Sequence, residues 1–481
     1  MGGRVAREDV ALGLPTDSTG PVDECSPARP RRPPVGTRRR EKDRGRLRHV
    51  GKVLLHLCGI FTCMVHGRIT GLALLAVVGV FVGQPAMGAV ACSSPSQVSP
   101  SQVSFSAWRT QADFRTGELT EGVQIQDVNG RAALTLRRGS DSGSWTSPVR
   151  RPQSGIGDLV PSWQARTPGD SWIEIRLSVQ VADHWSAWYQ MGNWSFDSNT
   201  TPRTSINGQK DADGKIYTDT YVPGANGAPT AYRLRAVLHA AAQDRPEVFA
   251  MAATTSSLTG AQGTSATTMK ETVELAVPPF SQMIHTGEFP AYGGGGAVWC
   301  SPTSTAMLLA YWNTGPSRHD LAGLGPDEVF DSHGRRDPEV DWAALHTWDV
   351  AYSGTGNWPF NTAYASAYGL DGSVRQYESL QDVENWILRK VPVAASIAWD
   401  NTDDRTDNDL DSASIPRSGG HLLVVSGFTS TGDVIVADPA APSNDTVRRV
   451  YDRGQFERNW LTGSTGTTYV VHPLRNGLSQ Q

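Results

Sequence analysis

The chain has 481 residues, 38% of them hydrophobic and 8% aromatic, which is enough for two packed domains with additional tails. Its formal net charge is -5 at pH 7, and no long basic face follows the N-terminal region, so we expect no nucleic-acid partner. One of the five cysteines, Cys300, lies in the part expected to be globular, whereas the other four are Cys25, Cys58, Cys63 and Cys92. This remaining thiol is either an inert core residue or a reactive group.

The N-terminal region has the pattern of a targeting signal. Residues 1–63 are rich in Arg, Pro and Gly, and we expect them to form a disordered basic extension. Residues 64–91 combine an apolar run at 71–83 with an Ala-x-Ala site, which is typical of a signal peptide. Met64 begins a compact version of this pattern, so an alternative is that the natural start is Met64.

The location of the remaining chain depends on how this segment is processed. An uncleaved segment is barely long enough to anchor the chain in a membrane. Cleavage before Cys92 would leave a terminal cysteine, and lipidation of Cys92 is a further alternative. In every case we expect the rest of the chain to be secreted or exposed on the cell surface.

The first half of the chain has the pattern of β-structure. Residues 92–104 repeat Ser, Pro and Gln and are expected to be a flexible linker. Residues 105–254 contain alternating apolar runs at 132–136, 172–179 and 231–238, separated by turn residues. This period of two predicts an antiparallel β-sandwich domain.

Tryptophan is frequent in this half. Aromatic side chains on the surface of a sandwich are able to stack on sugar rings, which would give a cell-wall or glycan contact, or to form a protein-binding face. Packing in the core is the simpler explanation. The residues concerned are Trp145, Trp163, Trp172, Trp185, Trp188 and Trp194.

The second half has mixed structure. Residues 255–272 are a Ser/Thr/Gly-rich linker, and a second domain is expected over 273–481. Helices precede most of the strands here, which favours an α+β arrangement. Helices are predicted at 303–312, 358–368 and 380–389, and strands at 392–399, 422–428, 433–437 and 468–471.

Cys300 lies between four consecutive glycines and the predicted helix at 303–312. Pro302 suits a first helical turn, so we expect Cys300 at the helix N-terminus, where the dipole and free N–H groups favour a thiolate. The glycines would let the backbone approach a substrate closely. The alternative is a flexible loop before an ordinary helix.

A cysteine nucleophile also needs a proton donor and a group that orients it. His421 lies at the start of an apolar strand, and Asp438 ends the next strand after a turn at 429–432. An antiparallel hairpin brings the two residues to within about two positions of register. A carboxylate beside an imidazole favours the imidazolium, so we predict a Cys300, His421 and Asp438 triad.

Gln282 precedes Cys300 on an extended segment that contains proline. Its side-chain amide is a candidate donor to an oxyanion, together with the Cys300 backbone N–H. Seen alone, a glutamine in such a segment is more often a solvated loop residue.

These residues resemble the peptidase C39-like family. The segments Pro-Phe-Ser-Gln, Trp-Cys-Ser-Pro-Thr-Ser, Gly-His-Leu-Leu-Val-Val-Ser-Gly-Phe and Val-Ala-Asp-Pro carry the resemblance over roughly 273–475. It implies a papain-like cysteine peptidase fold with Cys300, His421 and Asp438 as the triad and Gln282 at the oxyanion hole. The arrangement of signal, β-rich domain and C39-like domain is similar to secreted actinobacterial proteins of this family.

Three functions remain open. The first is hydrolysis of a peptide or protein substrate through a thioester outside the cell, and the second is cleavage of peptidoglycan amides. The third is an inactive surface protein whose tryptophan-rich half binds carbohydrate or protein. No cofactor or metal is expected, since the acidic stretch 400–411 lacks the glycine and final glutamate of a calcium loop and is interpreted as solvated.

Overall fold

The computed structural model describes residues 101–197, 200–260, 263–324, 337–403 and 407–474. The predicted basic extension, the signal segment and Cys92 lie outside these residues, so those predictions stay open. All described residues belong to one compact unit. Among them, no helix has both the length and the apolar character required to cross a membrane.

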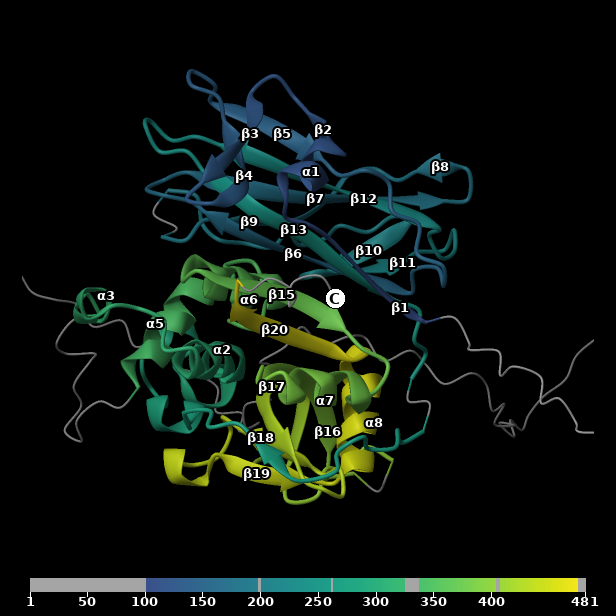
Figure 1. Ribbon diagram of the computed structural model, residues 1–481, viewed down its shortest axis with the longest axis vertical. Helices are drawn as coiled ribbons and strands as arrows, with labels where there is room; N and C mark the ends of the chain where they lie inside the picture. Colours follow the sequence, from purple (N-terminus) through teal and green to yellow (C-terminus); the bar gives the residue numbers. More distant parts are fainter. Residues whose placement is uncertain (1–100, 198–199, 261–262, 325–336, 404–406, 475–481) are drawn as a thin grey trace, which may run out of the picture. The chain divides into compact units, whose positions relative to one another are not determined.

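The first half is built almost entirely from antiparallel strands, as its alternating pattern predicted (Figure 1). The larger sheet has the order β10-β11-β6-β13-β4-β3, with β1 paired to β13. The smaller sheet has the order β2-β5-β12-β7-β8, with β9 paired to β7. The elements are β1 Val103–Trp108, α1 Gln111–Arg115, β2 Glu118–Leu119, β3 Val123–Val128, β4 Arg131–Leu136, β5 Ser142–Thr146, β6 Asp158–Arg166, β7 Trp172–Val181, β8 His184–Trp185, β9 Tyr189–Trp194, β10 Gly214–Tyr217, β11 Thr220–Pro223, β12 Ala231–His239 and β13 Glu247–Ser256.

The tryptophans of this half divide between the core and the surface. Trp145, Trp163 and Trp194 are buried in a hydrophobic cluster to which both sheets contribute. Trp185 and Trp188 are only half-buried and lie beside arginine side chains on the smaller sheet. Core packing therefore explains three of the tryptophans but leaves the others partly accessible.

The second half contains a third antiparallel sheet, in the order β15-β20-β16-β17-β18-β19, with β14 paired to β17 (Figure 1). Each predicted strand and helix of this half is found, with ends that differ by a few residues. The strands are β14 Val273–Glu274, β15 Leu370–Gln376, β16 Val393–Asp400, β17 Arg417–Phe428, β18 Val434–Ala437, β19 Arg448–Tyr451 and β20 Thr467–Pro473. The helices are α2 Cys300–Tyr311, α3 Arg318–Ala322, α5 Pro338–Thr347, α6 Trp358–Ala367, α7 Leu380–Leu388 and α8 Arg453–Ser464, and the short 3-10 turns are η1 Gln282–His285, η2 Pro290–Tyr292, η3 Gly296–Val298 and η4 Asn444–Thr446.

Helices cover both faces of this sheet. Alternate residues of a strand face opposite sides, so Leu422 and Val424 of β17 join the cluster that contains α2, α5 and α6. Leu423 and Val425 join a second cluster that contains α7 and α8. Burial on both faces explains why β17 has a continuous apolar run instead of an alternating one.

Polar side chains join the two halves. Gln164 of β6 donates to Asp371 of β15, and Gln376 of β15 donates to Asp158 of β6 at 2.8 Å. Asp219, in the turn between β10 and β11, accepts the Trp358 backbone N–H at 2.7 Å and so binds the first turn of α6. Because a buried polar group without a partner destabilises the fold, these matched pairs fix how the halves meet.

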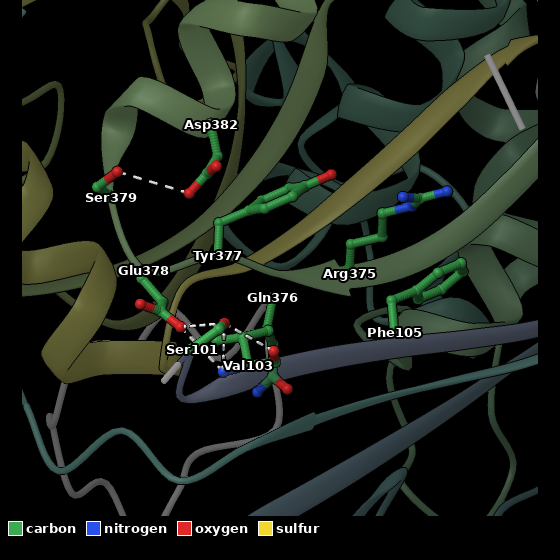
Figure 2. A pocket seen from close by; sticks show the side chains of 9 residues that line it. All are labelled: Ser101, Val103, Phe105, Arg375, Gln376, Tyr377, Glu378, Ser379 and Asp382. Atoms are coloured by element: carbon green, nitrogen blue, oxygen red, sulfur yellow. Dashed lines mark hydrogen bonds between the residues drawn. The ribbon is translucent and has the colours of Figure 1, made fainter. Parts of the chain in front are cut away.

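A cavity of about 320 Å³ lies at this junction, between β1 and the connection from β15 to α7 (Figure 2). Glu378 at its edge accepts the Val103 backbone N–H at 3.0 Å and a further N–H from Gln102, so it secures the start of β1. None of the candidate catalytic residues lines the cavity. The lining residues are Ser101, Val103, Phe105, Arg375, Gln376, Tyr377, Glu378, Ser379 and Asp382.

Candidate active site

Cys300 is the first residue of α2, as the sequence predicted, and Trp299 occupies the N-cap position. The preceding glycines have positive φ angles, with 62° at Gly295 and 55° at Gly296. A Cβ atom on Gly295 would lie 1.9 Å from the His285 carbonyl oxygen, and one on Gly296 would lie 2.6 Å from Thr286 Oγ1. The glycines are thus needed for close packing against the chain's own η1 segment, whereas the sequence suggested closeness to a substrate.

The Cys300 thiol lies next to the strand that carries His421. The backbone N–H of Leu422, the residue after His421, donates to Cys300 Sγ at 3.4 Å. A donor directed at sulfur stabilises the negatively charged thiolate more than the neutral thiol. The helix N-terminus acts in the same direction, so two independent features of the backbone favour a thiolate here.

His421 and Asp438 are paired, as the predicted hairpin required. Strands β17 and β18 are antiparallel with Val424 opposite Ala437, and His421 Nε2 lies 2.7 Å from Asp438 Oδ1. Since this contact occupies Nε2, proton exchange with a thiol would have to use Nδ1. The indole of Trp399 meets the His421 ring edge to face, with 5.4 Å between centroids, and limits its rotation.

Asp438 is held in its ionised form by four hydrogen bonds. Its Oδ1 also accepts the Ala440 backbone N–H at 2.9 Å, while Oδ2 accepts the hydroxyls of Ser414 at 2.8 Å and Tyr451 at 2.7 Å. Burial alone would raise the pKa of Asp438, but the charge of His421 and these donors outweigh it and lower the pKa to about 2. The carboxylate is therefore able to fix the orientation of His421 across the neutral pH range.

Gln282 is fully buried in η1, so the interpretation as a solvated loop residue is wrong. Its Nε2 donates to the Gly296 carbonyl at 2.6 Å, and its backbone N–H donates to the Pro439 carbonyl at 2.9 Å. One residue thus contacts both the loop before Cys300 and the residue after Asp438. Because an amide nitrogen carries two hydrogens, the second hydrogen of Nε2 remains for another acceptor.

The structure thus brings together all four candidate residues, and none of the four has exposed surface. Sequence reasoning missed Ser414 and Tyr451, which bind Asp438, because a serine and a tyrosine carry no signal of such a role. It also missed His285, Glu288 and Asp341, which form a polar cluster next to the glycine loop. The acidic stretch predicted to be solvated is exposed at 401–403, and 404–406 lie outside the described residues.

Comparisons with known proteins define the class. Residues 274–467 match the sequence model described as Peptidase_C39 like family, and residues 104–256 match the one described as Peptidase C39 N-terminal domain. These matches define a hydrolase of the peptidase class. The segment 274–467 thus belongs to the Peptidase_C39 like family, which confirms the resemblance seen in the sequence, and it follows a Peptidase C39 N-terminal domain.

Solved structures show more distant likenesses. A protein described as a C39-like peptidase from Bacillus anthracis is 17% identical, with 42% of this chain and 97% of that chain covered and a TM-score of 0.25. Xylanase 10B from Clostridium thermocellum, in complex with xylohexaose, is 10% identical over 36% of this chain and 31% of that chain, with a TM-score of 0.21. TmCBM61 in complex with β-1,4-galactotriose is 10% identical, with 29% of this chain and 89% of that chain covered and a TM-score of 0.18. No curated protein matches the chain.

Proposed function

We propose that the chain is a cysteine peptidase that acts outside the cell, with Cys300 as nucleophile, His421 as acid and base, and Asp438 as the group that orients His421. Gln282 is the proposed side-chain donor to the oxyanion. The observation that supports this best is the pair of contacts that surround His421: its Nε2 bonds Asp438, and the next N–H along the chain points at Cys300 Sγ.

In the first half-reaction the Cys300 thiolate attacks the carbonyl carbon of a peptide bond and forms a C–S bond. The negative charge moves to the carbonyl oxygen, where the Gln282 amide and the Cys300 backbone N–H stabilise it. His421 then gives its Nδ1 proton to the leaving nitrogen, the C–N bond breaks, and an amine departs. A thioester on Cys300 remains.

In the second half-reaction His421 is neutral and accepts a proton from water at Nδ1. The resulting hydroxide attacks the thioester carbon, the oxyanion forms at the same donors, and the C–S bond breaks. The thiolate leaves, while the imidazolium is again stabilised by Asp438. The products are a carboxylic acid and the enzyme in its starting state.

The geometry also supports the finer fold proposals. A cysteine at the start of α2 faces a histidine on β17 of an antiparallel sheet, which is the arrangement expected of a papain-like domain. The two sheets of the first half share one hydrophobic cluster, which supports a β-sandwich. We propose these as the folds of residues 273–481 and 105–254.

Cleavage of unfolded protein and peptide libraries by the secreted protein tests the function. We expect Cys300→Ser and His421→Ala to abolish cleavage. A matched control is His184→Ala, which removes another His–Asp contact, 2.9 Å to Asp213, in the first half. No cleavage and no trapped thioester in folded wild-type protein would contradict the proposal.

Peptidoglycan amide cleavage is the alternative substrate class for the same triad. Purified cell wall incubated with wild type and with Cys300→Ser distinguishes the two. Release of soluble fragments from wall only by the wild type, without cleavage of proteins, would favour peptidoglycan.

Glycan binding by the first half is a second proposed function. The Arg233 guanidinium lies 4.5 Å from the Trp185 ring centre and 4.8 Å from that of Trp188, so aromatic and cationic groups share one part of the smaller sheet. Aromatic rings beside polar donors suit a sugar chain. If this role is correct, the Cys300→Ser protein should be retained on purified wall polysaccharide. The double variant Trp185→Ala, Trp188→Ala should not be retained. Equal retention of the two proteins would contradict the role.

A further inference from the structure

Three side chains with metal-binding groups meet beside the glycine loop, outside the proposed triad. His285 ends η1, Glu288 follows it by three positions, and Asp341 lies in α5. His285 Nδ1 is 2.7 Å from Glu288 Oε2 and 3.2 Å from Asp341 Oδ1. One ligand atom from each residue lies within 4.8 Å of the other two, and the His285 and Asp341 side chains are 1% and 0% exposed.

The charges in this cluster do not balance. Two carboxylates face one imidazole, so the ionised cluster carries a net negative charge inside the protein, where charge is costly. A divalent cation at the centre of the cluster would compensate this excess negative charge.

We propose that His285, Glu288 and Asp341 bind one divalent transition-metal ion, for which Zn²⁺ is the best fit. Imidazole nitrogen and carboxylate oxygens bind Zn²⁺ at about 2.0–2.2 Å, which places tetrahedral ligand atoms roughly 3.4 Å apart. His285 Nδ1 and Asp341 Oδ1 are 3.2 Å apart, which is already close to this spacing of ligand atoms. Glu288 must exchange its direct hydrogen bond to His285 for a slightly more distant position around the ion.

The donor set also predicts selectivity. Ca²⁺ and Mg²⁺ prefer sites made entirely of oxygen and usually need six or more ligands. One nitrogen and two carboxylates instead favour an ion that accepts few ligands and binds imidazole well. We expect a water molecule to complete the coordination of Zn²⁺.

The position of the site suggests a structural purpose. η1 begins with Gln282 and ends with His285, while α5 packs against α2, the helix that begins with Cys300. An ion shared by His285 and Asp341 would join η1 to α5 and so restrain the segment that carries Gln282. The three ligands are positioning residues in this proposal.

Zinc binding by the full chain with Cys300→Ser tests the proposal, because this substitution removes the Cys300 thiol as a competing ligand and makes the result independent of catalysis. The other four cysteines are common to all the variants compared, so they do not affect the difference between them. The protein is purified without a histidine tag, treated with a chelator, and titrated with Zn²⁺ by calorimetry, with Ca²⁺ and Mg²⁺ for comparison. We expect about one additional equivalent of bound Zn²⁺ relative to the ligand variants, and a higher unfolding temperature.

Asp341→Asn and Glu288→Gln keep the side-chain shapes and should each lose that equivalent. His184→Gln, in the exposed contact with Asp213, should retain it and controls for weak surface binding. Two results overturn the proposal. One is the same zinc stoichiometry in the parent protein and in both ligand variants. The other is no Zn²⁺-dependent change in the unfolding temperature of the folded parent.

Discussion

Gln282 donates its backbone N–H to the carbonyl of Pro439, the residue that follows Asp438, at 2.9 Å. Through its side chain it also donates to Gly296 in the loop before Cys300. The proposed oxyanion donor is thus attached by hydrogen bonds to the segments that carry Cys300 and Asp438. This arrangement predicts that Gln282 is oriented before any substrate binds, which is the condition under which such donors are most effective.

The first prediction concerns Gln282→Ala. If its amide stabilises the oxyanion, kcat should fall by about 10²–10³-fold while KM changes little, because this interaction is made in the transition state. Steady-state peptide cleavage measures both constants. Gln381→Ala is the control, since Gln381 is another glutamine whose amide donates to a backbone carbonyl, here that of Ala266. A rise in KM with unchanged kcat would instead assign Gln282 to substrate binding.

The second prediction concerns Tyr451→Phe, which removes one donor to Asp438. The pKa of Asp438 is lowered, so its ionised form contributes stability above the usual carboxyl range, and this contribution is lost as pH falls toward about 2. Without the Tyr451 hydroxyl, the pKa should rise, and acid unfolding should begin at higher pH. Loss of a hydrogen bond to a charged group should also cost about 1.5–3 kcal/mol at neutral pH.

Circular dichroism measures both effects, the first across an acid titration and the second by urea unfolding at neutral pH. Tyr311→Phe serves as the control, because the Tyr311 hydroxyl donates to the Lys390 carbonyl at an exposed position. An acid transition identical to that of the wild type would show that Tyr451 does not help to ionise Asp438.

The third prediction concerns Asp219, which is buried where the two halves meet. Burial raises its pKa to about 7, although the Trp358 N–H opposes the shift. A raised pKa means that stability is greatest below the usual carboxyl range and is lost as pH rises through about 7. Asp219→Asn should therefore make the free energy of unfolding less dependent on pH between about 4 and 8. At about pH 8 the variant should be more stable than the wild type by up to a few kcal/mol. Urea unfolding at several pH values tests this. The same dependence of the free energy of unfolding on pH in the variant and in the wild type would contradict it.

The fourth prediction concerns Arg203, a buried arginine between the halves. It donates to the carbonyls of Ser195 at 2.7 Å and Leu345 at 2.7 Å, and burial lowers its pKa to about 10. Arg203→Met should destabilise the protein by about 3–5 kcal/mol, because several carbonyls lose their donors together. Arg166→Met breaks a pair with Glu247 on the surface and should cost less than about 1 kcal/mol. Equal effects in thermal unfolding would contradict a special role for Arg203.

The sequence was most informative where a local pattern placed the residues. Cys300 follows glycines and precedes a helix, and His421 and Asp438 lie on one hairpin, so short-range rules placed both features correctly. Gln282 belongs to no such pattern. Its burial depends on contacts with Gly296 and Pro439, which only the tertiary structure brings together.

The missed elements have a similar cause. β15 was not predicted because its Asp371, Ser373 and Arg375 are polar, yet the strand is fully buried. Its polar side chains have partners that the sequence does not reveal, such as Gln164 of the other half, which donates to Asp371. The cluster of His285 and Asp341 joins residues 56 positions apart, so no spacing in the sequence reveals it.

The complete burial of Cys300 has a consequence for how its chemistry is measured. A sulfur atom without exposed surface meets a reagent only in the moments when its surroundings open, as a protected amide meets solvent in hydrogen exchange. The rate of alkylation is then the product of an opening equilibrium and the reactivity of the exposed thiol. A slow rate on its own would therefore say little about activation. The shape of the pH profile, compared between wild type and His421→Ala, reports the ionisation of the thiol, whereas its height reports how often the site opens.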